Sequence, residues 1–213
     1  MSARRIIALI SQKGGSGKTT ATMQLAAGLA ARGRRVAIVD LDPQQSATRW
    51  SEAAPANAPF PAAMSLPDEA GSLKRTLRRA AREADIVLLD CPPSIEHPRT
   101  LEALEHADFA IVPVVPSPTD LWSTRGIERM ILDRGLAGAL LPNRVTHTTL
   151  AEEVLSILND FELPVLDAPL FQRSAYALSA VRGGSVFSLG HSALAARQEV
   201  ERLAAAVLTH LKD

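Results

Sequence analysis

The stretch Gln12–Thr20 (QKGGSGKTT) decides the fold of this 213-residue chain. The continuous apolar run Ile6–Ser11 precedes it and predicts a strand that is buried on both faces. The stretch Lys18–Arg32, which begins within it, is rich in alanine and leucine and predicts a helix. Gly33 follows at a C-cap position, which supports an end of the helix there. A glycine-rich turn between a buried strand and a helix is the setting that a phosphate-binding loop requires.

The residue types of this stretch suit the binding of phosphate groups. Glycines let the backbone curl so that several N–H groups point at one anion, and the helix N-terminus adds the positive end of its dipole. Lys18 is placed to reach the β- and γ-phosphates of a nucleotide, and the Thr19 hydroxyl is a ligand of the kind that Mg²⁺ takes. The strict form of the motif has glycine at position 12, where this chain has Gln12.

Aspartates close two further predicted strands. Val36–Asp40 is a second buried run, and Asp42 follows its last residue by two positions. Ile86–Asp90 is a third, with four apolar residues before Asp90, which is the Walker B pattern of a magnesium-binding aspartate. Because the carboxyl ends of parallel strands meet at one edge of a sheet, these carboxylates are expected beside the phosphate loop.

The remainder of the chain continues the alternation of strands and helices. Further strands are expected at Ala62–Leu66, Phe109–Val115, Ala139–Asn143 and Pro164–Leu166. Further helices are expected at Pro43–Ala54, with Pro43 in the first turn, and at Gly71–Ala84, Asp120–Asp133, Leu150–Asp160 and His191–Lys212. Strands separated by helices predict an α/β fold: one domain with a doubly wound, mainly parallel sheet and helices on both faces.

Composition excludes several classes of protein. Lys and Arg number 23, as do Asp and Glu, so the chain is not globally basic, although a local basic patch remains possible. The single cysteine, Cys91, excludes an intramolecular disulfide framework and any multi-cysteine metal site within one subunit, and it favours a reducing, cytoplasmic setting. No run reaches the roughly 18 apolar residues of a membrane span.

These motifs resemble those of a known family. The pattern KGGxGKT over Lys13–Thr19 is similar to the deviant Walker A motif of the ParA/MinD family of P-loop ATPases, and Asp40–Gln44 and Asp90–Ser94 resemble two more of its motifs. The resemblance implies an ATPase that takes ATP and Mg²⁺, releases ADP and phosphate, and forms a homodimer when ATP is bound. Lys13 stands at the signature-lysine position, which in the family reaches the phosphates of the partner subunit.

The resemblance also implies roles for individual residues. Lys13, Lys18 and Asp42 would be catalytic, with Asp42 positioning or deprotonating the attacking water. The implied metal ligands are Thr19, Asp40 and Asp90. The implied nucleotide contacts are Gly14, Gly15, Ser16, Gly17, Lys18, Thr19, Thr20 and, near the adenine, Asn143.

Within the family, Ala107–Trp122 and Phe171–Phe187 look like the small ParF-like ParA proteins. The first strand begins by Ile6, so no N-terminal helix-turn-helix and no specific operator recognition are expected. The terminal helix carries no Trp or Phe on its apolar face, which predicts packing on the body and no membrane partner.

This branch of the family implies non-specific binding of nucleoid DNA by the ATP dimer, and therefore a cytoplasmic, nucleoid-associated protein. The candidate DNA contacts are Arg173, Arg182, Arg197 and Arg202. A cargo adaptor or ParB-like partner would stimulate ATP hydrolysis. The cargo would be a plasmid, a chromosome locus or a protein body.

Two questions stay open at the level of sequence. The alternative function is a metabolic ATP-dependent enzyme of the same fold, resembling dethiobiotin synthetase, although Lys13 and the segment Asp40–Gln44 favour the positioning ATPase. An electron-delivering iron protein is excluded, because it needs two cluster cysteines per subunit.

The second question is a basic helix face, which is either solvated or binds DNA or an acidic partner. Its residues are Lys74, Arg75, Arg78, Arg79 and Arg82.

Overall fold

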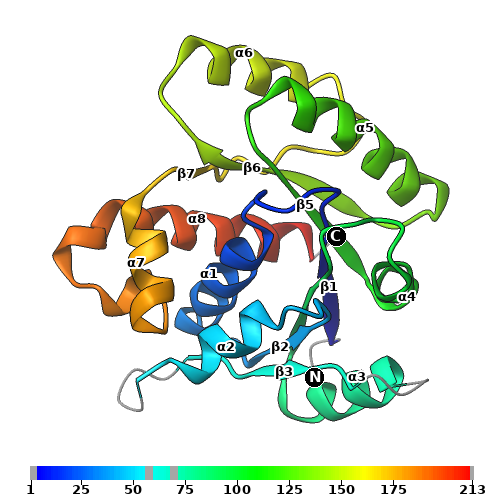
Figure 1. The fold of residues 1–213 in the computed structure, drawn as a ribbon, viewed down its shortest axis with the longest axis vertical. Coiled ribbons are helices and arrows are strands. Elements are labelled where there is room, and N and C mark those ends of the chain that lie inside the picture. The colour runs from blue at the N-terminus through cyan, green and yellow to red at the C-terminus, as the bar shows by residue number, and fades with distance from the viewer. Residues whose placement is uncertain (1–3, 56–59, 68–71, 212–213) are drawn as a thin grey trace.

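Seven strands form one sheet in the computed structural model, which describes residues 4–55, 60–67 and 72–211 (Figure 1). They are β1 (Arg5–Leu9), β2 (Val36–Asp40), β3 (Ala63–Ser65), β4 (Ile86–Asp90), β5 (Phe109–Val114), β6 (Gly138–Val145) and β7 (Leu170–Phe171). Their order across the sheet is β3-β2-β4-β1-β5-β6-β7, and each neighbouring pair is parallel. Strand β1 lies between β4 and β5, and the strand order runs outward in opposite directions on its two sides. Open α/β sheets bind their ligands at such a switch point.

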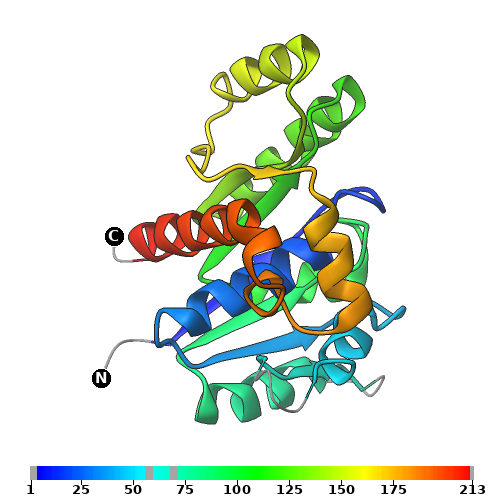
Figure 2. The ribbon, with the colours of Figure 1, turned by 90° about the vertical axis from the view of Figure 1, so that its left-hand side faces the viewer.

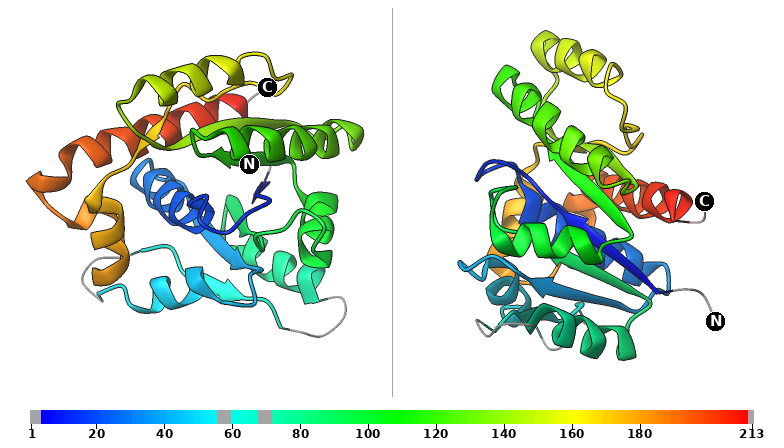
Figure 3. Two further views of the ribbon diagram at one scale, coloured as in Figure 1. Left: turned by 45° about the horizontal axis from the view of Figure 1, so that its top comes forward. Right: turned by 90° about the vertical axis from the view of Figure 1, so that its right-hand side faces the viewer.

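Helices cover both faces of the sheet, which confirms the predicted fold class (Figures 2 and 3). They are α1 (Lys18–Ala31), α2 (Ser46–Glu52), α3 (Ser72–Glu83), α4 (Pro98–His106), α5 (Pro118–Asp133), α6 (Thr149–Leu158), α7 (Ser174–Arg182) and α8 (Leu194–His210). Two 3₁₀ turns, η1 (Val186–Ser188) and η2 (His191–Ala193), connect α7 to α8. Among the described residues, no helix has both the length and the apolar character to cross a membrane.

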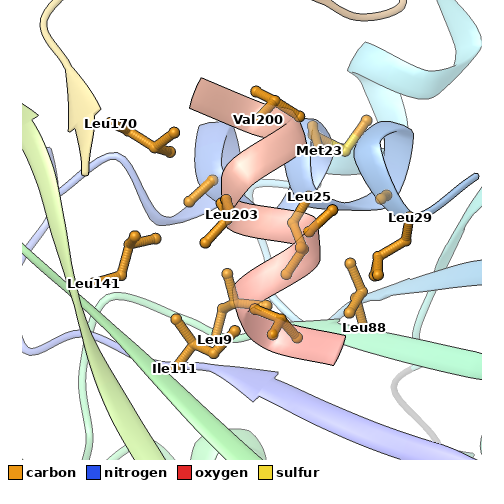
Figure 4. Packing of buried hydrophobic residues seen from close by; sticks show 14 of the residues in the cluster. Leu9, Met23, Leu25, Leu29, Leu88, Ile111, Leu141, Leu170, Val200 and Leu203 are labelled. Carbon is orange, nitrogen blue, oxygen red and sulfur yellow. The ribbon is translucent and has the colours of Figure 1, made fainter. Parts of the chain in front are cut away.

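The alternation of side chains along the central strand builds two separate cores. Ile7 and Leu9 of β1 belong to the core beneath α1 and α8, shown in Figure 4. Ala8 and Ile10 belong to the core on the opposite face, where α3, α4 and α5 pack. Every residue of β4 is buried, as expected for a parallel strand that is covered on both faces.

The terminal helix α8 packs directly on α1, as predicted (Figure 2). Its side chains Val200 and Leu203 are fully buried beside Leu25 and Leu29 of α1 (Figure 4). The two backbones approach closely at Gly28, where an added Cβ would lie 2.8 Å from Val200 Cγ1 and 3.0 Å from the Val200 carbonyl oxygen. The helix that carries the phosphate loop is therefore held between the sheet and α8.

Several predicted boundaries were wrong. Helix α2 begins at Ser46, so Pro43 does not lie in its first turn. The cause is a local turn, in which Asp42 Oδ1 accepts a hydrogen bond from the Gln44 N–H and Gln45 adopts a left-handed φ of 53°. The strand expected at Pro164–Leu166 is only an isolated bridge between Val165 and Leu140.

Other elements were not predicted or begin elsewhere. Helices α4 and α7 and the short strand β7 were missed. The long terminal helix was expected from His191, but α8 begins at Leu194, because η2 occupies the preceding three residues.

The close approach at Gly28 gives a testable prediction. We expect Gly28→Ala to lower the free energy of unfolding by about 1–3 kcal/mol, because the β-branched Val200 and its backbone cannot withdraw without moving α8. The matched control is Gly126→Ala in α5, where nothing lies within 4 Å of the new Cβ. That variant should gain up to about 1 kcal/mol of helix propensity. Urea unfolding measures both, and equal stabilisation of the two variants would contradict the packing argument.

Candidate nucleotide-binding site

The phosphate loop lines an open cavity of about 280 Å³ at the carboxyl edge of the sheet. Gly15 and Gly17 adopt left-handed φ values of 84° and 77°, a conformation that glycine takes without steric cost. Gly17 caps α1 without any side-chain hydrogen bond, so the first N–H groups of the helix are open to an anion. The cavity brings together most of the predicted site: Lys13, Gly14, Gly15, Ser16, Gly17, Lys18, Thr19, Thr20 and Asp42.

Asp90 is the point where the Walker B strand meets the phosphate loop. Its Oδ1 lies 3.2 Å from the Lys18 ammonium, and its Oδ2 accepts a hydrogen bond of 2.7 Å from the Thr19 hydroxyl. Both partners of the ion pair are buried, with 5% of the Lys18 side chain and none of Asp90 exposed to solvent. A buried pair of this kind is stable only when further hydrogen bonds satisfy its atoms.

Thr22 supplies one such bond and was not predicted. Its hydroxyl lies 3.1 Å from Asp90 Oδ1 and 3.0 Å from the Lys18 carbonyl oxygen, so one proton serves two acceptors. Thr22 follows Lys18 by four residues, which places both on the same face of α1. That spacing is the signal in the sequence that could have identified Thr22.

The donor set around Thr19 and Asp90 fits Mg²⁺. A hydroxyl and a carboxylate are hard oxygen ligands, and Mg²⁺ in nucleotide sites uses one or two such protein ligands together with phosphate oxygens and water. Thr19 lines the phosphate cavity, and Asp90 lies directly behind it through their hydrogen bond. These residues therefore fit a metal ion that binds together with a nucleotide.

The buried Asp40 is engaged within the fold. Its Oδ2 accepts hydrogen bonds from the Thr48 N–H at 2.8 Å and the Thr48 hydroxyl at 3.1 Å, and its Oδ1 accepts one from the Asp42 N–H. Burial raises the pKa of Asp40, and the bonds from Thr48 oppose that rise. Asp40 pairs with Asp90 in the register of β2 and β4, and its bonds to Thr48 anchor the start of α2.

Asp42 faces the cavity that Asp40 does not line. It is half-buried, and its Oδ1 accepts the hydrogen bond from the Gln44 N–H at 2.9 Å. Its Oδ2 has no hydrogen-bond partner among the described residues and is available to a water molecule in the cavity. Asp40 at the end of β2 is therefore bonded within the fold, whereas Asp42 after it faces the cavity.

The two lysines of the loop point to different places. Lys18 is buried against Asp90, whereas Lys13 lies exposed at the rim, where its ammonium donates to the carbonyl oxygen of Thr119 at 3.0 Å. Gln12 accepts a hydrogen bond of 3.1 Å from the Ile95 N–H. The residue that replaces the first glycine of the strict motif thus ties the phosphate loop to the segment that follows β4.

A larger cavity, of about 650 Å³, adjoins the phosphate loop and shares Gly15, Gly17 and Thr20 with it. Asn143 lies where the two meet, and its amide donates to the Ser16 carbonyl oxygen at 2.7 Å. An added Cβ on Gly17 would lie 2.5 Å from that amide nitrogen, so the packing requires glycine. The cavity has room for a nucleoside attached to phosphates in the loop.

Residues of β6, β7 and α7 complete the lining of this larger cavity, and sequence reasoning missed Tyr176 and Ala177 among them. Arg144 donates to the Gly15 carbonyl oxygen at 2.8 Å. Phe171 lines the cavity and stacks on His147 with ring centroids 4.8 Å apart. Phe171, Tyr176 and Ala177 come from β7 and α7, the elements that were not predicted.

Helix α7 is joined to α1 and α2 by buried side-chain bonds. Gln24 of α1 donates to the Ser179 hydroxyl at 2.9 Å and accepts from the Val186 N–H at 3.1 Å. The Trp50 indole N–H of α2 donates to the Gly184 carbonyl oxygen at 2.8 Å. Helix α7, which lines the larger cavity, is therefore fixed to α1 and α2, which line the phosphate cavity.

The four predicted DNA-binding arginines differ in their surroundings. Arg173 pairs with the buried carboxylate of Glu199 at 2.6 Å. Arg197 lies half-buried with its guanidinium 5.5 Å from the centre of the Phe187 ring. Arg182 and Arg202 are exposed, on α7 and α8. The arginines thus form two engaged and two solvent-facing cations.

The contact of Thr22 with Asp90 gives a prediction for the site. We expect Thr22→Val to weaken magnesium-dependent nucleotide binding about tenfold, because a buried charged acceptor loses a hydrogen bond worth roughly 1.5 kcal/mol. Calorimetric titration with and without Mg²⁺ measures the effect. The matched control is Thr124→Val in α5, because Thr124 is also buried and bonded to the carbonyl oxygen four residues before it. Equal nucleotide affinity in the two variants would contradict the role of Thr22.

Comparison with known proteins agrees with this geometry. The family model for the CobQ/CobB/MinD/ParA nucleotide binding domain matches residues 7–186. "Maintenance of carboxysome distribution protein A" of Halothiobacillus neapolitanus is 32% identical over 203 residues, which cover 92% of this chain and 93% of that protein.

Solved structures give the same picture of the fold. A putative plasmid partition protein of Borrelia burgdorferi B31, bound to AMPPNP, superposes with a TM-score of 0.76 at 19% identity over 97% of this chain and 99% of that chain. Cobyrinic acid a,c-diamide synthase of Mycobacterium smegmatis, with bound ATP analogue and magnesium, superposes with a TM-score of 0.67 at 26% identity over 99% and 97%. The chain therefore belongs to the CobQ/CobB/MinD/ParA family of nucleotide-binding domains, as its motifs indicated.

Proposed function

We propose that this protein is an ATP-dependent molecular switch that positions a cargo. ATP and Mg²⁺ bind in the phosphate loop, two subunits dimerise, and the dimer binds nucleoid DNA without sequence specificity. A partner protein then stimulates hydrolysis, which releases the dimer. The observation that carries the proposal is the division of work between the two loop lysines, with Lys18 buried at its own site and Lys13 exposed at the rim.

The exposed position of Lys13 supports a role in a second subunit. Its ammonium is held by one carbonyl oxygen at the rim, a contact that a stronger acceptor such as a phosphate can replace. A cation that reaches a partner's phosphates adds positive charge where negative charge develops during phosphoryl transfer. Dimerisation would then complete each catalytic site.

The residues at the floor of the cavity support hydrolysis. Lys18 and the N–H groups at the start of α1 would hold the phosphates, and Thr19 and Asp90 would hold a magnesium ion, which would supply neutralising charge to the phosphate oxygens. Asp42 orients a water molecule through the carboxylate oxygen that faces the cavity. Asp42 would contribute mainly by orienting the water, which agrees with a slow ATPase that needs a partner.

The relatives support cargo positioning as the use of this switch. The name of the Halothiobacillus relative concerns carboxysome distribution, and the Borrelia structure is a putative partition protein. We infer a cargo adaptor or ParB-like protein as the stimulating partner and place the protein on the nucleoid in the cytoplasm. Its cargo is a protein body or a DNA locus.

A metabolic ATP-dependent enzyme is the second candidate. The superposition on the cobyrinic acid a,c-diamide synthase favours it, because that structure carries an ATP analogue and magnesium on the same fold. An enzyme of this type consumes ATP only in the presence of its acceptor. ATP turnover that rises with DNA and a partner protein supports the switch, and turnover that requires a small acceptor supports the enzyme.

The first test concerns Lys13. We expect Lys13→Ala to abolish dimer formation with ATP, because the cation at the rim is lost, and to change nucleotide affinity by less than about threefold, because Lys18 is intact. Light scattering measures the mass, and Arg129→Ala removes an exposed cation from α5 as the control. An unchanged ATP-dependent dimer would refute a role for Lys13 in the partner's site.

The second test concerns Asp42. We expect Asp42→Ala to lower ATP hydrolysis about 100-fold and to trap the ATP-bound dimer, because the water is no longer oriented. Phosphate release and gel filtration measure the two effects. Asp42→Asn keeps an oxygen for the Gln44 N–H and removes the charge, so it separates catalysis from the turn. Undiminished hydrolysis in both variants would exclude Asp42 from catalysis.

A further inference from the structure

Helix α3 carries a dense row of cations that takes no part in the nucleotide site. We name Lys74, Arg75, Arg78, Arg79 and Arg82 the α3 basic face, and all five are exposed. The opposite side of the helix buries Leu73, Leu77 and Ala80 against the sheet. Figures 1 and 3 show α3 on the outside of the molecule, and none of its residues lines either cavity of the site.

The α3 basic face works against the stability of its own helix. Lys74 and Arg75 lie in the first turn, where the positive end of the helix dipole disfavours cations and where no acidic residue is present. The pairs Lys74/Arg78, Arg75/Arg79 and Arg78/Arg82 place like charges four residues apart, which is also unfavourable. Helix stability therefore does not account for this arrangement of cations.

The intramolecular partners of these cations are few. Lys74, Arg78, Arg79 and Arg82 make no hydrogen bond or ion pair to another residue in the part of the chain that the structure describes. Glu83 is the one acidic residue of α3. Lys74, Arg78, Arg79 and Arg82 therefore form a field of one sign, which favours a polyanion.

The spacing and chemistry of the face fit the backbone of duplex DNA. Lys74, Arg78 and Arg82 recur every four residues, which is a rise of about 6 Å per step. Each DNA strand offers a phosphate about every 3.4 Å along the axis, so successive cations meet every second phosphate. One guanidinium group can bind two oxygens of a phosphate at once. Helix α3 has no aromatic residue on which an unpaired base could stack, so its chemistry suits a duplex better than a single strand.

We propose that the α3 basic face is a DNA-binding surface that contacts the phosphate backbone of duplex DNA without reading its sequence. The inference rests on the proposed function, because it names the surface that the nucleoid-bound state uses. It adds a site that is separate from the arginines of α7 and α8, of which Arg173 and Arg197 are engaged with Glu199 and Phe187. Because the face lies outside both cavities, DNA and nucleotide bind at the same time.

The test compares two double variants of the full chain. Arg78→Gln/Arg82→Gln removes two charges from the α3 basic face, and Arg129→Gln/Arg134→Gln removes two from exposed positions on α5 and its C-cap. Binding to a random-sequence duplex is followed by fluorescence anisotropy with a non-hydrolysable ATP analogue and Mg²⁺, across roughly 50–200 mM salt. Nucleotide affinity and thermal stability are measured for each protein.

We expect the α3 variant to lose at least about tenfold in DNA affinity at the lowest salt. Its slope of log affinity against log salt should become less steep by about two for each subunit whose α3 basic face contacts the duplex, one for each lost phosphate contact. The α5 variant should bind DNA as the unmodified protein does. The α3 variant should keep its nucleotide affinity and melt at the same or a higher temperature, because like-charge repulsion is relieved.

The outcomes separate this inference from the proposed function. If the unmodified protein binds DNA and the α3 variant binds equally well with the same salt slope, the α3 proposal is overturned while the switch stands. A selective loss of partner-stimulated ATPase in that case would identify an acidic protein as the ligand of the face. If the unmodified protein binds no DNA in any nucleotide state, both the nucleoid-bound state and the α3 proposal fail.

Discussion

The buried contact between Lys18 and Asp90 is the interaction on which the rest of the molecule depends. It joins the first residue of α1 to the last residue of β4, and so fixes the phosphate loop against the strand next to β1. An ion pair without solvent is costly unless its remaining atoms are bonded, and the hydroxyls of Thr19 and Thr22 meet that need. Binding chemistry and fold stability thus share one set of atoms.

The parts of the fold that local sequence controls could be predicted. Strands β1, β2 and β4 are continuous apolar runs, because a parallel strand covered by helices buries both faces. The elements that depend on tertiary contacts could not. Helix α4 begins at Pro98, directly after a proline-containing turn, and α7 buries only Tyr176 and Ser179, too few for a clear helical period. The start of α2 depends on the turn at Asp42, and the hydrogen bond from the Gln44 N–H to the Asp42 side chain leaves no periodic pattern in the sequence.

The site divides in the same way. The glycines, Lys18 and Thr19 lie within one short segment, so spacing alone places them around one cavity. Asp90 is about 70 residues away, yet the parallel sheet brings it to the loop because both strands end at the same edge. By contrast, part of the larger cavity is lined by residues of β7 and α7, which were not predicted. The hydrogen bonds between Asp40 and Thr48 could be predicted only if the start of α2 were known. No pattern in the sequence carries that information.

The hydrogen bond between Trp50 and Gly184 completes a closed set of contacts among the segments next to the two cavities. Asp40 fixes the start of α2, Trp50 of α2 holds the end of α7, and Gln24 connects α7 back to the helix of the phosphate loop. Each of these segments is therefore held by buried bonds to two neighbours. Loss of the single Trp50 bond would therefore remove a support from α2 and from the segment after α7 together, although Trp50 and Gly184 lie 134 residues apart in the sequence.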